Sequence, residues 1–163
     1  MNNLKQLLKR PLSKVSTGHV VAVLIIALLG FADAAFLTIE HYRGVVPPCS
    51  VTEGCDVVLG SQFSSLFGIP TALFGAIYYL LIVLGAFIFL ESKHVGESLA
   101  SHHFSILKWC LLGTIIGFLM SLWFIYLQVF ILHSYCAYCL GSALTSIILF
   151  IIAIDVIRKN ENI

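Results

Sequence analysis

Four long apolar runs are the feature that most constrains how this chain folds. They cover about residues 19–42, 69–90, 104–132 and 135–157, with polar intervals between them. Each run reaches the length of about 20 apolar residues that a helix needs to cross a membrane. Only 10% of the 163 residues are charged, whereas a soluble domain carries roughly 25%. The sequence therefore predicts an all-α integral membrane protein, folded as a four-transmembrane-helix bundle.

The first run also has features of a signal peptide. It follows a basic segment, and Ala32, Asp33 and Ala34 resemble a cleavage site with small residues. The apolar pattern nevertheless continues to Ile39, so we interpret the run as a membrane span. Asp33 lies inside this span, where an acid is either functional or a neutral carboxylic acid near a helix end. The sequence assigns it no role.

The polar intervals set the domain organisation. Residues 1–18 form a basic N-terminal arm, 19–157 the membrane domain and 158–163 a short tail. The interval 43–68 is the longest, and its apolar residues predict a short amphipathic helix that lies in the interface and caps the bundle. These residues are Val57, Val58, Leu59, Phe63, Leu66 and Phe67. Residues 91–105 predict a short polar loop, whose histidines are solvated rather than metal ligands.

The distribution of basic residues predicts the orientation. Four spans place both termini on one side, and that side would hold every lysine and every arginine except Arg43. Because basic residues concentrate in cytoplasmic loops, both termini are expected in the cytoplasm. The formal net charge of +1 argues against nucleic acid as a partner. Membrane lipid is the expected surrounding.

Four of the five cysteines fall on the opposite, outer side. Cys136 and Cys139 form a C-x-x-C pair where the fourth run begins, and Cys49 and Cys55 lie in the outer loop. A thiol in the first turn of a helix experiences the positive end of the helix dipole, which favours the reactive thiolate. The two pairs therefore suggest a relay of thiol–disulfide exchange at the membrane boundary. Cys110 has no partner in the sequence and is expected to be a packing residue.

Two other interpretations of the cysteines remain open. The four outer cysteines match the ligand number of a structural zinc site in a non-catalytic membrane protein. Alternatively, one pair is a structural disulfide in a small transporter or assembly subunit, which would give Asp33 a functional place.

The order of the motifs resembles the vitamin K epoxide reductase (VKOR) family in its bacterial form. The matching residues are Cys49, Cys55, Ser61, Phe67, Gly68, Ile69, Pro70, Phe74, Gly75, Cys136 and Cys139. The likeness covers about residues 19–157. It implies a bundle that encloses a quinone, either ubiquinone or menaquinone, in a bacterial inner (plasma) membrane with both cysteine pairs on the periplasmic or extracellular side.

The resemblance also implies roles for single residues. Cys139 would lie next to the quinone, and Ser61 would donate a hydrogen bond to a quinone carbonyl. Cys136 would exchange with Cys55, and Cys49 would form the mixed disulfide with the substrate protein. The implied activity is that of a membrane thiol:quinone oxidoreductase that supports disulfide bond formation.

Three departures refine this expectation. Many bacterial members carry a fused thioredoxin-like domain, for which this chain has no room, so the partner is expected to be a separate exported thioredoxin-fold (DsbA-like) protein. Animal members have asparagine and tyrosine where this chain has Thr71 and Ala143, which favours oxidation of a partner dithiol over epoxide reduction. Five residues separate Cys49 from Cys55, fewer than in many members.

The DsbB type of oxidase also has four spans, but it has its cysteine motifs in the reverse order.

Overall fold

Four long helices make up most of the described chain. The computed structural model describes residues 16–48, 54–95 and 100–161. The long helices are α2 (Thr17–Arg43), α4 (Thr71–Val95), α5 (Ala100–Tyr126) and α6 (Ala137–Glu161). Each is long and apolar enough to cross a membrane. The predicted four-helix membrane fold is therefore confirmed.

Small residues let the helices approach closely. Helix α2 packs against α4 and α6, and α5 packs against α6 and α4. A Cβ atom on Gly30 of α2 would collide with the ring of Tyr79 of α4, whereas one on Gly75 would make an ordinary contact of 3.6 Å with Ala34. Close backbone approach is how helices associate in lipid, where burial of apolar side chains gives little net driving force. The outward side chains are large and apolar, as with Leu29, Leu81 and Ile116.

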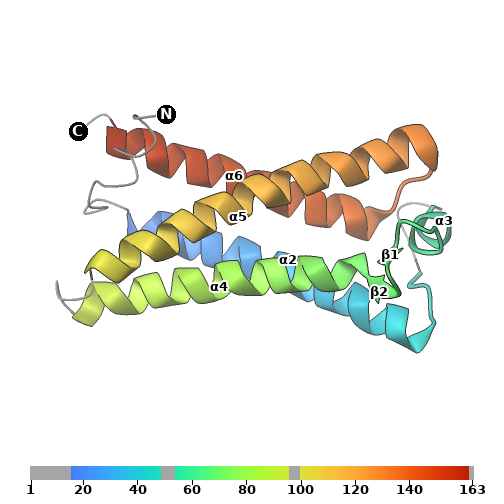
Figure 1. Cartoon of the computed structure of the whole chain (residues 1–163), viewed down its shortest axis with the longest axis horizontal. Coiled ribbons are helices and arrows are strands. Elements are labelled where there is room, and N and C mark those ends of the chain that lie inside the picture. Colours follow the sequence, from blue (N-terminus) through green and yellow to red (C-terminus); the bar gives the residue numbers. More distant parts are fainter. Residues whose placement is uncertain (1–15, 49–53, 96–99, 162–163) are drawn as a thin grey trace.

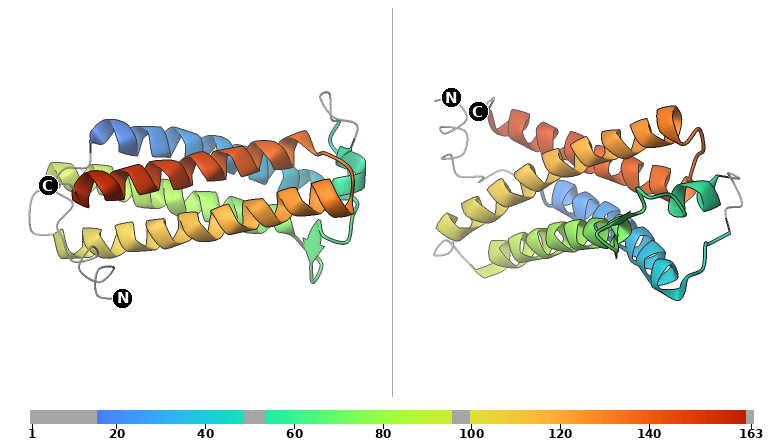
Figure 2. Two further views of the ribbon diagram at one scale, coloured as in Figure 1. Left: turned by 90° about the horizontal axis from the view of Figure 1, so that it is seen from above. Right: turned by 45° about the vertical axis from the view of Figure 1, so that its right-hand side comes forward.

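The bundle has two distinct ends (Figure 1). One end holds the start of α2, the end of α4, the start of α5 and the end of α6. The other end holds α3 (Cys55–Leu59), the strands β1 (Ser65–Leu66) and β2 (Ile69–Pro70), and the connection from α5 to α6. Figure 2 shows the same division from two further directions. The segment 54–70 therefore caps one end of the bundle.

The cap contains a short helix, as predicted, but over fewer residues than predicted. Helix α3 has only five residues, and β1 and β2 pair antiparallel with Ser65 opposite Pro70. Phe67 and Gly68 have φ values of 53° and 81°, so they form a tight hairpin turn instead of continuing the helix. The prediction that apolar residues beyond Leu59 are helical was wrong. Phe63 lies in a turn, and Leu66 and Phe67 belong to the hairpin.

The helix boundaries also differ in two places. Helix α4 extends to Val95 and α5 begins at Ala100, so the polar loop predicted over 91–105 is mostly helical. Helical hydrogen bonding does not stop where the apolar residues do, because each turn satisfies its own backbone groups. Helix α5 continues as η2, a π-helical segment (Leu127–Ile131) that the apolar pattern does not reveal.

Candidate functional site

The cap brings two distant cysteines into contact. Cys55 is the first residue of α3, and Cys136 directly precedes α6. Their Sγ atoms are 3.5 Å apart, although the residues are 81 positions apart in the sequence. Both side chains are buried. Cys55 is disulfide-bonded, whereas Cys136 and Cys139 are free thiols. Cys49 lies outside the described residues.

A small apolar cluster surrounds these sulfurs. Val58 is buried with Cys55 and Cys136, and Leu59, Leu132 and Tyr138 pack around them. Gly54, just before α3, allows this approach, since a Cβ atom there would lie 2.7 Å from the Tyr135 backbone nitrogen. Contacts under 3.0 Å essentially never occur for a real Cβ. The sequence analysis did not single out Gly54, because only the fold shows what lies next to it.

Gln128 holds the backbone of Cys136 in place. It is 2% exposed and lies in η2. Its Oε1 accepts a hydrogen bond of 2.8 Å from the Cys136 backbone N–H. Its own carbonyl accepts a bond of 3.2 Å from the Ser134 N–H, so it fixes the α5–α6 connection at two points. The sequence analysis missed Gln128, although a lone amide in an apolar span is a usable signal.

The start of α6 activates the Cys136 thiol. Cys136 has the N-cap position, and the backbone N–H of Cys139 donates to its Sγ over 3.5 Å. The pKa of Cys136 is lowered to about 7, mainly by hydrogen bonding from the Cys139 side chain. The backbone N–H groups of Cys139 and Tyr138 contribute less in the same direction, and burial and the charge of Asp33 oppose the shift. Cys136 is therefore the thiolate-forming member of the C-x-x-C pair near neutral pH.

Ser61 and Cys139 line one small pocket beside these thiols. Apolar side chains including Phe63, Phe124 and Leu127 form its walls. The Ser61 hydroxyl donates to the Val58 carbonyl over 2.7 Å and so faces α3 in this state. A wall of apolar rings with a few hydroxyls and a thiol suits a flat apolar ring that carries carbonyl oxygens, as in a quinone. The pocket has about 30 Å³ of open space in this state.

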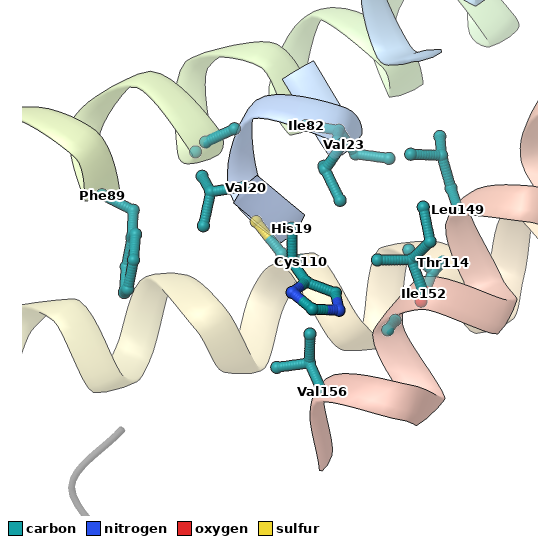
Figure 3. Close-up of a pocket in the computed structure, with 13 residues that line it drawn as sticks. His19, Val20, Val23, Ile82, Phe89, Cys110, Thr114, Leu149, Ile152 and Val156 are labelled. Atoms are coloured by element: carbon teal, nitrogen blue, oxygen red, sulfur yellow. The ribbon is translucent and has the colours of Figure 1, made fainter. Parts of the chain in front are cut away.

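A larger apolar pocket lies at the other end of the bundle (Figure 3). All four long helices contribute to it, with His19 from α2, Phe89 from α4, Cys110 from α5 and Val156 from α6. The Cys110 thiol is half-buried there, away from the other cysteines. Cys110 therefore lies at the end of the bundle that also holds the start of α2 and the end of α6.

The site and the fold together define a class of protein. A membrane-spanning bundle that holds a disulfide sulfur against a free thiol at one end is built for thiol–disulfide exchange. The sequence matches the family model described as "Vitamin K epoxide reductase family" over residues 21–154. The chain belongs to this family and is a membrane thiol–disulfide oxidoreductase. Family members generally use a quinone as electron acceptor and work with thioredoxin-like partners. No curated protein matches the chain.

Proposed function

We propose that this protein oxidises an exported thioredoxin-fold (DsbA-like) partner and passes the electrons to a membrane quinone, ubiquinone or menaquinone. The observation that carries the proposal is the 3.5 Å contact between Sγ of Cys55 and Sγ of Cys136. Reacting atoms that are held about 3–3.5 Å apart are close to an attack geometry. Electrons can therefore cross from the outer to the inner pair without large movement of α6.

The exchange begins at the outer pair. A partner thiolate attacks Sγ of Cys49, and Cys55 leaves as a thiolate. The second partner thiol then releases the oxidised partner and leaves Cys49 reduced. Each step replaces one S–S bond by another, so no electron is left unpaired and no further reagent is needed.

The inner pair takes the electrons next. The Cys55 thiolate attacks Sγ of Cys136 in an oxidised Cys136–Cys139 pair, and Cys139 leaves. Cys49 then attacks Cys55, which restores the outer disulfide and frees Cys136. The result is a disulfide-bonded Cys55 beside two free inner thiols, which is the arrangement in the structure. This arrangement supports an order of steps in which the inner pair is reoxidised next.

The pocket beside Cys139 is the proposed quinone site. When bound, the quinone supplies an acceptor for two electrons and two protons. Cys139 would face it, and Ser61 would turn its hydroxyl from Val58 toward a carbonyl oxygen. Phe63 and Phe124 would form the apolar walls. Water exclusion by these side chains would protect the inner thiols from side reactions.

The proposed orientation places this site on the outer side of a bacterial inner (plasma) membrane. The start of α2, the end of α4, the start of α5 and the end of α6 lie together at the far end of the bundle. Those segments adjoin the basic residues, which supports a cytoplasmic location for that end. The partner would then reach Cys49 from the exported side.

The structural alternatives have less support. Within residues 16–48, 54–95 and 100–161, no three His, Cys, Asp or Glu side chains gather as metal ligands. A purely structural disulfide gives no reason for a thiol of lowered pKa to lie against one of its sulfurs. Stoichiometric zinc in purified protein would favour the zinc interpretation instead.

The test uses purified protein, a reduced thioredoxin-fold partner and a quinone whose absorbance reports reduction. We expect C139S to abolish quinone reduction, because the last thiol is gone. C49S should block turnover with the partner but leave quinone reduction by a small dithiol. C110S is the matched control and should behave as wild type. Quinone reduction that persists in C139S would overturn the proposed electron route.

A further inference from the structure

Asp33 is a half-buried acid that the electron route does not use. It lies ten residues before the outer end of α2, or about 15 Å along the helix axis. Among the described residues, its Oδ2 is buried without a hydrogen-bond partner. A carboxyl oxygen left unpaired inside a membrane bundle is costly, and such residues usually mark a functional site. The question is which group it serves.

The contacts of the residues one turn before and one turn after Asp33 place it near the inner thiols. Gly30, one turn earlier, faces the Tyr79 ring on α4. Phe36, one turn later, packs its ring 5.6 Å from that of Tyr138, the neighbour of Cys139. The face of α2 that carries Asp33 therefore runs between α4 and the start of α6.

Tyr79 does not satisfy the Asp33 carboxyl. Its hydroxyl donates to the Ser142 carbonyl over 2.6 Å and lies 2.7 Å from Oγ1 of Thr145, so it is committed to α6. The titratable groups that face Asp33 from the packed helices are Tyr79 on α4 and Cys136 and Cys139 at the start of α6. Because the Tyr79 hydroxyl is already hydrogen-bonded to α6, the thiols of Cys136 and Cys139 are the groups that remain to exchange a proton with Asp33.

Asp33 is within electrostatic reach of both thiols. Its charge raises the pKa of Cys136, in opposition to the stronger hydrogen bonds that lower it. It also interacts with Cys139. Electrostatic attraction between a carboxylate and a nearby proton is stronger in a water-poor interior than in water, because the dielectric constant is lower there.

We propose that Asp33 is the proton acceptor for Cys139 when the inner pair is oxidised. This inference rests on the proposed function. Formation of the Cys136–Cys139 bond removes two electrons, which pass to the quinone as oxidant. Cys136 enters as a thiolate, so one thiol proton remains, on Cys139. The Asp33 carboxylate takes this proton, directly or through one water molecule, and later passes it to the reduced acceptor, which regenerates the carboxylate.

The substitution D33N has two opposite expected effects. Without quinone, Cys136 should react faster with iodoacetamide at pH 6, by about twofold, because a repelling charge is gone. With quinone, oxidation of the pre-reduced inner pair should be about 100-fold slower, the loss typical of one general base. The pH–rate profile of D33N for this oxidation should lack the part in which the rate depends on the ionisation of the Asp33 carboxyl. A general defect in folding would not raise the reactivity of one thiol and slow its oxidation together.

Two further variants complete the test. D33E keeps a carboxylate and should retain inner-pair oxidation within about tenfold of wild type. D155N makes the same change in α6 at the far end, where Asp155 pairs with His19, and should match wild type in both assays. If D33N fails to fold, D33E decides, and a loss as large as 100-fold in D33E would overturn the inference.

Failure of this inference differs from failure of the proposed function. If wild type reduces quinone and D33N matches it in rate and pH profile, Asp33 is not the proton acceptor. If wild type does not reduce quinone, the proposed function fails, and with it the role of Asp33. Unchanged Cys136 alkylation in D33N would also count against the inference, because Asp33 would then be out of reach.

Discussion

Replacing Gln128 by methionine removes the acceptor that holds the Cys136 backbone N–H. Methionine is of similar length and apolar, so the side-chain volume is nearly kept while the 2.8 Å hydrogen bond is lost. The N–H would then be buried without a partner at a residue that is 0% exposed. An unsatisfied buried donor costs about 1–3 kcal/mol. That cost falls on the closed arrangement in which the Cys55 and Cys136 sulfurs touch.

The cost converts into a measurable rate. If opening the α5–α6 connection relieves it, the closed population falls by about 5- to 150-fold relative to the open one. The assay follows formation of the Cys55–Cys136 disulfide under mild oxidant, in a background that lacks Cys49 and Cys139. We expect Q128M to slow this cross-link by up to that factor, which is reached when the open form becomes the major one.

A control separates this effect from a general loss of stability. S121A also removes a buried polar group from α5, but the Ser121 hydroxyl donates to the Gly117 carbonyl of its own helix. It should cross-link at the rate of the parent. Equal rates for Q128M and the parent would refute the view that Gln128 positions Cys136.

Two further predictions concern helix packing and pH. G30A should destabilise the bundle by about 1–3 kcal/mol, because the added Cβ collides with the Tyr79 ring, whereas G75A should be tolerated. Thermal unfolding in detergent measures both variants, and equal stability of the two would contradict the packing. In a background that lacks Cys49 and Cys55, alkylation of Cys136 should be half-maximal near pH 7, since its thiolate forms above its lowered pKa. Adding C139A to this background should shift the midpoint upward, because it removes the hydrogen bond that lowers the pKa most. A midpoint at pH 9 with Cys139 present would contradict the assigned hydrogen bonds.

The sequence predicts the bundle well because lipid imposes a simple rule. A span must be long, apolar and helical, so the four apolar runs indicate the four helices. The C-x-x-C pair at the start of the fourth run also falls where predicted, with Cys136 at the helix cap. Both features depend on local sequence and not on distant contacts.

The rest of the site depends on contacts that no local pattern encodes. Gln128 acts on Cys136 only because a π-helical segment turns it toward the next helix. Gly54 matters only because the Tyr135 backbone lies against it. The hairpin after α3 was mistaken for helix because a two-residue turn at Phe67 and Gly68 carries no helix-breaking proline.

The exchange between Cys55 and Cys136 is the central claim, and disulfide mapping of the C139A variant by mass spectrometry tests it most directly. In this variant the lone Cys136 thiolate can attack Cys55 and has no inner partner to release it. We expect a peptide pair joined through Cys55 and Cys136, with Cys49 set free for alkylation. A protein that keeps Cys136 fully reduced at neutral pH while its outer disulfide stays intact would contradict the account.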